Sequence, residues 1–585
     1  MPNKDAIWTG STAKGFDIPI GRAGATKRQM LTLGRGTAQH ALIAGKTGSG
    51  KSTLLHAMIT NLALIYSPDE AELYLIDFKK GVEFRAYATS LLPHARVIAI
   101  ESEREFGLSV LQRLDAELRD RGDRFRAAGA NDLEGYREYL KSTGSPLAVP
   151  RILFIVDEFQ EFFVEDDKLS QESALLLDRL VRQGRAFGLH VLLGSQTLGG
   201  AYSLARSTID QMAVRIALQC SDADAQLILS KDNNAARLLS RPGEAIYNDA
   251  NGLVEGNDPF QVVWLDEDRR ETLLTDIRNR ANGKYPPPLV FEGNIAAEVQ
   301  NNRLLAEALK AKTEVRVPVA WFGDAVAIKD PTSAAFRMQS GANVLLIGQQ
   351  EESALALMAT AMASLAAQVK TPGLFTVLDG TPDDSDHADY LRKVAASLGY
   401  PDASIDRAGM ANSLAALAQE IERRQQGVSA ERVPRFLFVQ GLHRFRELRK
   451  ADDDFGYGRK SDQPKAAGEL LATILKDGPT VGIHSIVWCD SLTNLTRALE
   501  RQALKEFSQR VLFQMSATDS STLIDTPAAS RLGRTRALFV QEDLERPEKF
   551  RPYGLPDMKW LREIGTTLNP AEHVSNVPVR RSARY

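Results

Sequence analysis

A glycine-rich octapeptide near the N-terminus has the residue types that bind a phosphate chain. Residues 45–52 read Gly-Lys-Thr-Gly-Ser-Gly-Lys-Ser, after an apolar run and before a helical pattern. Glycines let backbone N–H groups turn inward around phosphate oxygens, and the positive end of the following helix faces the same charge. Lys51 would contact the β- and γ-phosphates, and the Ser52 hydroxyl would bind Mg2+. The loop predicts that ATP is bound by Gly45, Lys46, Thr47, Gly48, Ser49, Gly50, Lys51, Ser52 and Thr53.

Two polar strand ends could complete such a site. Asp157 and Glu158 follow an apolar run, where Asp157 can share the Mg2+ held by Ser52 and Glu158 can polarise the attacking water. A solvated acidic strand end is the alternative. Ser195-Gln196 ends another apolar run, and in a parallel sheet this end faces the same crevice. Gln196 would contact the γ-phosphate and report its loss, unless it is an ordinary polar loop residue.

The arginines and basic runs of the sequence do not by themselves identify a catalytic arginine or a nucleic-acid site. Phosphoryl transfer often needs an arginine from a neighbouring subunit. Four candidates follow the acidic pair, and their spacing does not choose among them: Arg182, Arg185, Arg206 and Arg215. The basic stretch 119–126 and the tail 580–584 could touch nucleic acid, although such runs are more often solvated faces.

Composition bounds the class of protein. The 585 residues predict two to four domains, and a net charge of −3 neither favours nor excludes a nucleic-acid partner. Cys220 and Cys489 are far apart, so no disulfide or metal-binding spacing is expected, and both are interpreted as core residues in a reducing cytosol. No apolar window is long enough for a transmembrane helix, and the N-terminus has no signal-peptide core. These features predict a cytoplasmic protein.

The elements that must position these residues alternate in type. Apolar runs typical of buried parallel strands occur at residues 73–77, 96–100, 151–156 and 190–194. Between them, apolar residues recur at helical spacing, as at Phe106, Val110, Leu111, Leu114 and Leu118. This alternation predicts an α/β fold, with a largely parallel sheet and helices on both faces.

The pattern then starts again. A proline triplet at 286–288 indicates a linker, because prolines continue neither a helix nor a central strand. Beyond it, five runs echo the first half in the same order: 344–347, 375–379, 434–439, 482–487 and 510–514. The chain is therefore expected to contain two tandem copies of one domain. Two unrelated α/β domains are the alternative.

The second copy lacks the chemistry of the first. Lys51 aligns with Ala354 and Ser52 with Leu355, while Glu351 and Glu352 replace loop residues and would repel phosphate. The acidic pair becomes Gln440-Gly441, with no carboxylate for Mg2+. We expect residues 316–560 to bind no ATP and to serve as a regulatory or partner-docking layer.

Several stretches resemble the FtsK/SpoIIIE family of ring-forming motor ATPases. The matching stretches are 42–52, 74–81, 92–94, 156–159, 184–190, 195–197 and 214–218. The resemblance covers residues 15–270 and, weakened, 316–545. It implies RecA-like P-loop domains in a hexameric ring, with ATP between subunits and a substrate threaded through the pore. It also implies that Arg185 or Arg215, which match arginines of the family's motifs, reaches the neighbour's nucleotide.

Most members of this family look like translocases of double-stranded DNA. The resemblance therefore implies that the chain hydrolyses ATP to translocate double-stranded DNA. The tandem of an active and a degenerate copy, and the Asp77–Gly81 run, look more like the type VII secretion ATPases, which move proteins. Membrane segments of that branch are absent here, although the chain can be the motor part of something longer, recruited to the membrane by a partner. An ATP-dependent switch or scaffold is the third possibility. The expected organisation is an active domain at 1–270, a linker at 271–315, a degenerate domain at 316–560 and a basic tail at 561–585.

Overall fold

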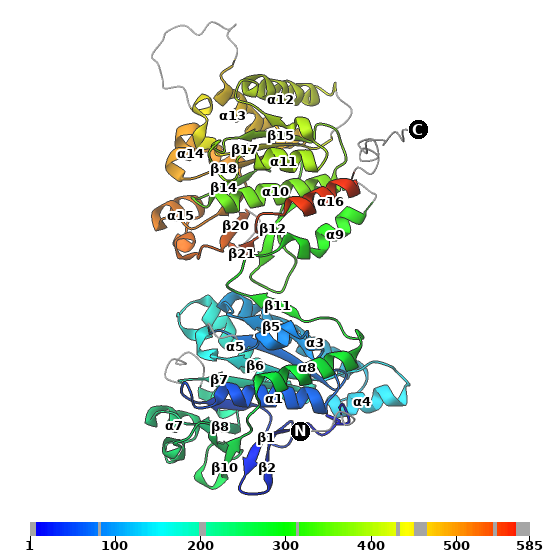
Figure 1. Cartoon of the computed structure of the whole chain (residues 1–585), viewed down its shortest axis with the longest axis vertical. Coiled ribbons are helices and arrows are strands. Elements are labelled where there is room, and N and C mark those ends of the chain that lie inside the picture. The colour runs from blue at the N-terminus through cyan, green and yellow to red at the C-terminus, as the bar shows by residue number, and fades with distance from the viewer. Residues whose placement is uncertain are drawn as a thin grey trace, which may run out of the picture. The chain divides into compact units, whose positions relative to one another are not determined.

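The computed structural model describes residues 7–79, 83–197, 206–311, 315–428, 433–449, 465–541 and 547–568. Contacts divide the chain into two compact units, Met1–Asn294 and Ile295–Tyr585. Each unit has its own sheet covered by helices (Figure 1). No helix in these ranges combines the length and apolarity that crossing a membrane requires.

The first unit is built on an eleven-stranded sheet. Its strands, in spatial order, are β11 (Leu289–Glu292), β5 (Ala95–Ile100), β4 (Ala71–Asp77), β6 (Arg151–Asp157), β7 (Leu189–Ser195), β3 (Ala41–Ala44), β8 (Val214–Leu218), β9 (Glu244–Asn248), β10 (Asn257–Val262), β1 (Phe16–Ala23) and β2 (Lys27–Leu33). The strands from β11 to β8 are parallel, and those from β8 to β2 are antiparallel. The parallel strands are apolar along their length because helices cover both faces.

The helices of the first unit return the chain between parallel strands. They are α1 (Lys51–Ile65), α2 (Arg85–Thr89), α3 (Arg104–Ala127), α4 (Leu133–Ser142), α5 (Lys168–Phe187), α6 (Arg206–Asp210), α7 (Asp222–Ile228) and α8 (Glu267–Ala281). Helices α1 and α8 share one core with the strands, whereas α3 and α5 pack against each other. This arrangement brings the carboxyl ends of β3, β4, β6 and β7 to one edge of the sheet.

The second unit repeats this topology. Its ten strands, in spatial order, are β13 (Thr332–Ala335), β12 (Val319–Ala325), β21 (Glu548–Pro552), β20 (Ala537–Gln541), β19 (Gln509–Leu512), β14 (Val344–Ile347), β18 (Ile483–Cys489), β17 (Arg435–Gln440), β15 (Phe375–Asp379) and β16 (Ser404–Ile405). Read from β16 to β13, this is the order from β5 to β2 in the first unit, and β11 alone has no counterpart. The structure therefore confirms that the echoed runs are strands of a repeated fold.

The helices of the second unit cover both faces of its sheet. They are α9 (Arg303–Lys310), α10 (Glu351–Gln368), α11 (Tyr390–Ser397), α12 (Met410–Gln425), α13 (Ala467–Asp477), α14 (Leu492–Ala498), α15 (Ala517–Ile524) and α16 (Met558–Leu568). Helices α10, α11 and α16 pack in one core, and α12, α13 and α14 in another. Helix α10 is buried from Ala354 to Gln368, and its many alanines suit a helix enclosed on all sides.

The boundaries differ from those expected. Residues 271–315, predicted as a linker, contribute most of α8 and all of β11 to the first unit, and α9 to the second. The division falls after Asn294 because β11 pairs with β5 beyond the proline triplet. The predicted tail begins within α16, whose Leu561 and Ile564 are buried in the second core. Its basic residues 580–584 lie outside the described part of the chain.

Arg215 has a structural role that the sequence did not indicate. Its side chain is 6% exposed and donates to the carbonyl oxygens of Ile228 and Leu229, at 3.1 and 2.6 Å, at the end of α7. Arg510 in β19 donates in the same way to Leu523 O at 2.6 Å, near the end of α15. Since both copies keep this cap, the contact is a structural one, and the prediction that Arg215 reaches a neighbour's nucleotide stays untested.

Replacing either arginine by alanine should destabilise its own unit. Arg215→Ala and Arg510→Ala each leave buried carbonyl oxygens unpaired, which costs about 2–3 kcal/mol in the free energy of unfolding. Hydrogen exchange of each unit during denaturant titration measures this effect. Full protection of the first unit in Arg215→Ala, together with lost ATP turnover, would instead restore the catalytic interpretation.

Candidate functional site

The phosphate-binding loop connects the end of β3 to the start of α1. The N–H of Gly45 donates to Ser195 O at 3.2 Å, and that of Lys46 to Gln219 O at 2.9 Å, so both neighbouring strands hold the loop. Gly50 has φ +100°, and an added Cβ would lie 3.0 Å from the backbone N of Gly243. Only glycine fits this turn without strain.

The loop borders a cavity of about 420 Å3. Its lining combines loop residues with residues of five other segments: Lys46, Thr47, Gly48, Gly50, Lys51, Ser52, Thr53, Asp77, Lys79, Glu83, Asp157, Gln196, Pro242 and Trp264. Two further loop residues, Gly45 and Ser49, are buried beneath it. The structure thus brings together residues that the sequence separates by more than two hundred positions.

Lys51 and the acidic strand end form a buried ionic cluster. The Lys51 ammonium contacts Asp157 and lies 3.0 Å from Glu158 Oε1, and all three side chains are at most 6% exposed. Burial raises the pKa of Asp157, although Lys51 opposes this. Burial also acts to raise the pKa of Glu158, but the charge of Lys51 and the Gln160 amide outweigh it and lower the pKa. Glu158 is therefore an ionised carboxylate near neutral pH.

The reach of Asp157 depends on a glycine in the next strand. Strand β7 lies between β6 and β3, so the Asp157 side chain must cross it to meet Lys51. Gly194 pairs with Asp157 in this register, and an added Cβ would lie 2.7 Å from Asp157 Oδ1. A side chain at Gly194 would block the ionic cluster.

Glu158 adopts a conformation that side chains disfavour. Its φ and ψ are 54° and 47°, in the left-handed region, which costs a non-glycine residue about 1–2 kcal/mol. Gly441 holds the same place in the second unit, with φ 72°. The strained backbone at Glu158 therefore positions its carboxylate in the site. Such strain is typical of functional positions.

Gln196 lies between the phosphate loop and the acidic pair. Its side-chain oxygen accepts a hydrogen bond from Thr47 Oγ1 at 3.1 Å, and its backbone N–H donates to Glu158 Oε2 at 3.2 Å. Gln160 donates to the same Glu158 oxygen at 2.7 Å. The pair of glutamines fixes one carboxylate oxygen and leaves Glu158 Oε1 to Lys51.

Three residues of the site were missed by the sequence analysis. Glu83 accepts a hydrogen bond from Ser52 Oγ at 2.8 Å and lies 3.3 Å from His56 Nε2, beside the expected metal position. Asp77 lines the cavity, where burial and the nearby charges of Asp157 and Glu83 raise its pKa to about 7 despite the Lys79 N–H. Asp77 ends the run 73–77 that was predicted as a strand and lies in the matching stretch 74–81, whereas Glu83 lies two residues beyond that stretch.

Trp264 is the third missed residue. Its side chain is 76% exposed, yet it lines the cavity together with Pro242. An exposed indole beside a phosphate-binding loop provides a flat apolar surface for a nucleotide base. No spacing rule could have found it, because it follows β10, far from the loop in sequence.

The other arginines lie away from this cavity. Arg185 is exposed in the last turn of α5, at the sheet edge opposite the phosphate loop, and borders a separate cavity with Arg151. Contact of Arg185 with the nucleotide of a neighbouring copy therefore stays a prediction. Arg182 pairs with Asp178 at 2.8 Å, and the side chain of Arg206 is outside the described set.

Comparison with known proteins agrees with this geometry. Residues 10–200 match the model of the FtsK/SpoIIIE family. The first unit carries an FtsK/SpoIIIE domain. The chain thus contains a P-loop ATPase domain, and its fold is that of tandem P-loop ATPase domains.

Curated relatives of this domain fall into two groups. The ESX secretion system protein YukB of Bacillus subtilis (strain 168) is 30% identical over 263 residues, which are 44% of this chain and 17% of YukB. The DNA translocase FtsK of Streptococcus pyogenes serotype M3 (strain SSI-1) is 26% identical over 280 residues, 46% of this chain and 33% of that protein. The chain therefore spans a third or less of these relatives.

Solved structures match both units. The cytoplasmic domain of the type VII secretion ATPase EccC of Thermomonospora curvata superposes with a TM-score of 0.66 at 20% identity, covering 97% of this chain and 68% of that one. ATPases 2 and 3 of the same protein, solved in complex with a signal sequence peptide, give 0.55 at 20% identity, covering 94% of each chain. These likenesses show the shared tandem fold.

The second unit fills the corresponding site with its own side chains. Helix α10 begins at Glu351, which aligns with Gly48, so the phosphate loop has become a helical turn. Arg444 holds the Glu351 carboxylate through two hydrogen bonds of 2.7 Å and lowers its pKa. Trp488 stands at the position of Gly194, is 1% exposed and donates from its indole to Gly348 O at 3.0 Å. These contacts leave no phosphate cradle.

Two substitutions separate binding from hydrolysis. Lys51→Ala should abolish ATP binding in the full chain, because Lys51 is the buried one of the three lysines that line the cavity, whereas Lys46 and Lys79 are exposed, and the second unit lacks a cradle. Glu158→Gln should bind ATP but lose turnover by at least 100-fold, since an amide cannot accept the water's proton. Calorimetry and single-turnover assays measure the two effects. Micromolar ATP binding by Lys51→Ala would reveal a second nucleotide site.

Substitution of Trp264 should show whether this side chain contacts the base of ATP or its phosphates. Trp264→Ala is expected to weaken ATP binding roughly 10-fold to 100-fold, equivalent to about 1–3 kcal/mol of lost stacking. Inorganic tripolyphosphate, which has no base, should bind the variant and the wild type equally, and Trp264→Phe should retain most ATP affinity. Equal losses for both ligands would argue against a base contact.

Proposed function

We propose that the chain is an ATP-driven ring motor that acts on a protein substrate, hydrolysing ATP in its FtsK/SpoIIIE domain and docking the substrate on its second unit. The observation that carries the proposal is the second unit itself. Its fold is intact, but its nucleotide site is closed by Trp488 and by the Glu351–Arg444 pair. A domain that keeps its fold but lacks the catalytic site is suited to binding a protein partner.

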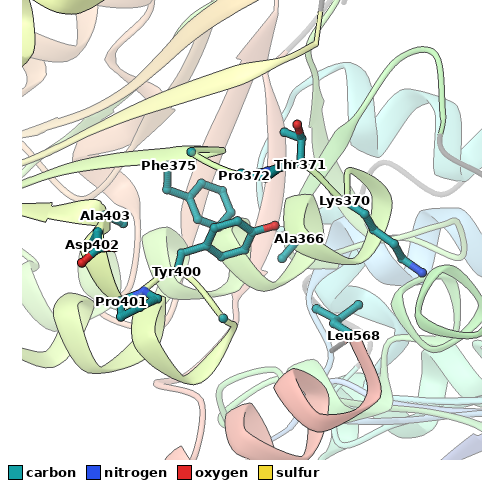
Figure 2. A pocket seen from close by; sticks show the side chains of 12 residues that line it. Ala366, Lys370, Thr371, Pro372, Phe375, Tyr400, Pro401, Asp402, Ala403 and Leu568 are labelled. Carbon is teal, nitrogen blue, oxygen red and sulfur yellow. The ribbon is translucent and has the colours of Figure 1, made fainter. Parts of the chain in front are cut away.

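The second unit also offers a docking cavity. It measures about 390 Å3 and lies where α10, β15 and α16 meet. Figure 2 shows the rings of Phe375 and Tyr400 next to each other, with Asp402 on one side and Lys370 and Leu568 on the other. The ring centroids are 4.8 Å apart in an edge-to-face contact. Such an aromatic floor with charged flanks suits an apolar side chain on a helical peptide, and the EccC relative was solved with a signal sequence peptide.

The first unit has the groups that hydrolysis requires. Oxygen donors from Ser52, Glu83, Asp77 and Asp157 surround one end of the cavity, and Asp77 Oδ2 is buried without a hydrogen-bond partner among the described residues. This donor set fits Mg2+, with Ser52 and Asp157 as its holders. When bound, Mg2+ neutralises charge on the phosphate oxygens.

When ATP binds, the Lys51 ammonium must exchange its carboxylate partners for the phosphates. The ammonium contacts Asp157 and Glu158, so moving to the phosphates releases Glu158 Oε1. Gln160 and the Gln196 N–H keep Glu158 Oε2 in place. Oε1 is then the atom that accepts a proton from the attacking water. Arg185 of a neighbouring copy is the proposed cation that completes the site in a hexameric ring.

Double-stranded DNA is the competing substrate, because FtsK relatives are DNA translocases. The basic stretch 119–126 argues against it. All four of its arginines pair with carboxylates of the same helix: Arg119 with Asp115, Arg121 with Glu117, Arg124 with Asp120, and Arg126 with Asp123. Their charge is therefore largely compensated.

Stimulation of ATP turnover decides between these substrates. A helical secretion-type protein should raise turnover of the wild type, and linear double-stranded DNA should not. Tyr400→Ala should keep basal turnover, since Tyr400 lies in the second unit, but lose the stimulation. Stimulation by DNA alone assigns the translocase function, and no stimulation by either substrate favours an ATP-dependent switch.

A further inference from the structure

Three side chains with metal-binding atoms meet in the closed site of the second unit. His443 follows β17, whereas Cys489 ends β18 and Asp490 comes directly after it. They hold the places of Gln160, Ser195 and Gln196, which are uncharged residues of the polar network around Glu158 in the first unit, where Ser195 Oγ lies 2.8 Å from Gln160 Oε1. Each polar residue of that network has thus been exchanged for a metal-ligand type.

The spacing of these atoms approaches that of a coordination sphere. His443 Nδ1 lies 3.6 Å from Asp490 Oδ1, Cys489 Sγ lies 3.8 Å from the same oxygen, and all three ligand atoms are within 4.8 Å of one another. Tetrahedral Zn2+ with sulfur, nitrogen and oxygen ligands needs separations of about 3.3–3.6 Å. Binding would draw the ligand atoms together by up to about 1 Å.

Surrounding groups orient the ligands. Asn494 donates from Nδ2 to both Asp490 oxygens, at 2.9 and 3.0 Å, and Ser491 Oγ adds a third hydrogen bond at 3.0 Å. The His443 ring packs edge-to-face on Trp488 at 5.4 Å. Such outer contacts hold ligands in place at metal sites. Cys489 is fully buried, whereas Asp490 is 30% exposed at its side chain, which leaves a path for an ion.

The local charge also suits a cation. Arg444, the neighbour of His443, is neutralised by Glu351 through its two 2.7 Å hydrogen bonds. Gln440, at the end of β17, is fully buried, and neither atom of its amide has a partner among the described residues. Buried polar groups normally have a hydrogen-bond partner, so the unpaired amide at this strand end leaves hydrogen-bonding capacity for a bound water.

We propose that His443, Cys489 and Asp490 bind one Zn2+ ion in the second unit, with a fourth position open to water. The Cys489 thiol releases its proton to solvent as the thiolate coordinates the ion. The ion joins the ends of β17 and β18, which nucleotide contacts would link in an active copy. Spacing rules missed the site because its ligands come from two strands that only the sheet brings together.

Cobalt substitution tests the proposal, because Co2+ bound by thiolate gives a charge-transfer absorption band that oxygen ligands do not give. The full chain, reduced and stripped with a chelator, should take up one Co2+ with this band, and Zn2+ should displace it, in keeping with its higher affinity. Cys489→Ser should lose the band. Cys220→Ser, the matched control at the other cysteine of the sequence, should keep it.

His443→Gln installs the residue found in the first unit and provides a second variant should Cys489→Ser fold poorly. It should lower Co2+ affinity at least about tenfold while leaving ATP binding to the first unit unchanged. The proposal is overturned by the absence of the band in the wild type at excess Co2+. A band that survives in His443→Gln with full affinity, or that depends on Cys220, overturns it equally.

Discussion

The crossing of β7 by the Asp157 side chain is the contact on which the active site depends. Lys51 starts a helix that follows β3, and Asp157 ends β6, one strand further away. Gly194 leaves the space through which the carboxylate reaches the ammonium. Without that space, the phosphate loop and the acidic strand end could not share a nucleotide, whatever their sequences.

The second unit shows what happens when that space is filled. Trp488 replaces Gly194, its indole bonds the backbone where the phosphate loop would begin, and Gln440 replaces Asp157. The remaining volume holds the Glu351–Arg444 pair. The fold tolerates these changes because the apolar strands and helix α10 keep their buried core, which Trp488 joins. Catalytic chemistry and fold stability are therefore separable in this architecture.

Features shared by both units mark what the fold itself requires. Arg215 and Arg510 cap equivalent helices, and His190 and His484 both bond a backbone oxygen ahead of the phosphate-loop strand, at 2.8 Å. Features that differ mark what each unit does. Glu158 bears left-handed strain where Gly441 relaxes it. A tandem repeat thus serves as its own control, because a contact that both copies keep does not depend on the residues that differ between their nucleotide sites.

The sequence by itself determined the class of fold, the repeat and the replacement of the nucleotide-site residues in the second copy. Apolar runs and a glycine loop are local signals, since burial on both faces and phosphate contact act on consecutive residues. Contacts between distant strands are not local. The roles of Glu83, Trp264 and Gly194, the structural use of Arg215 and the meeting of His443 with Cys489 depend on strand order and register, which pair residues far apart in the chain. Only the tertiary structure could decide these.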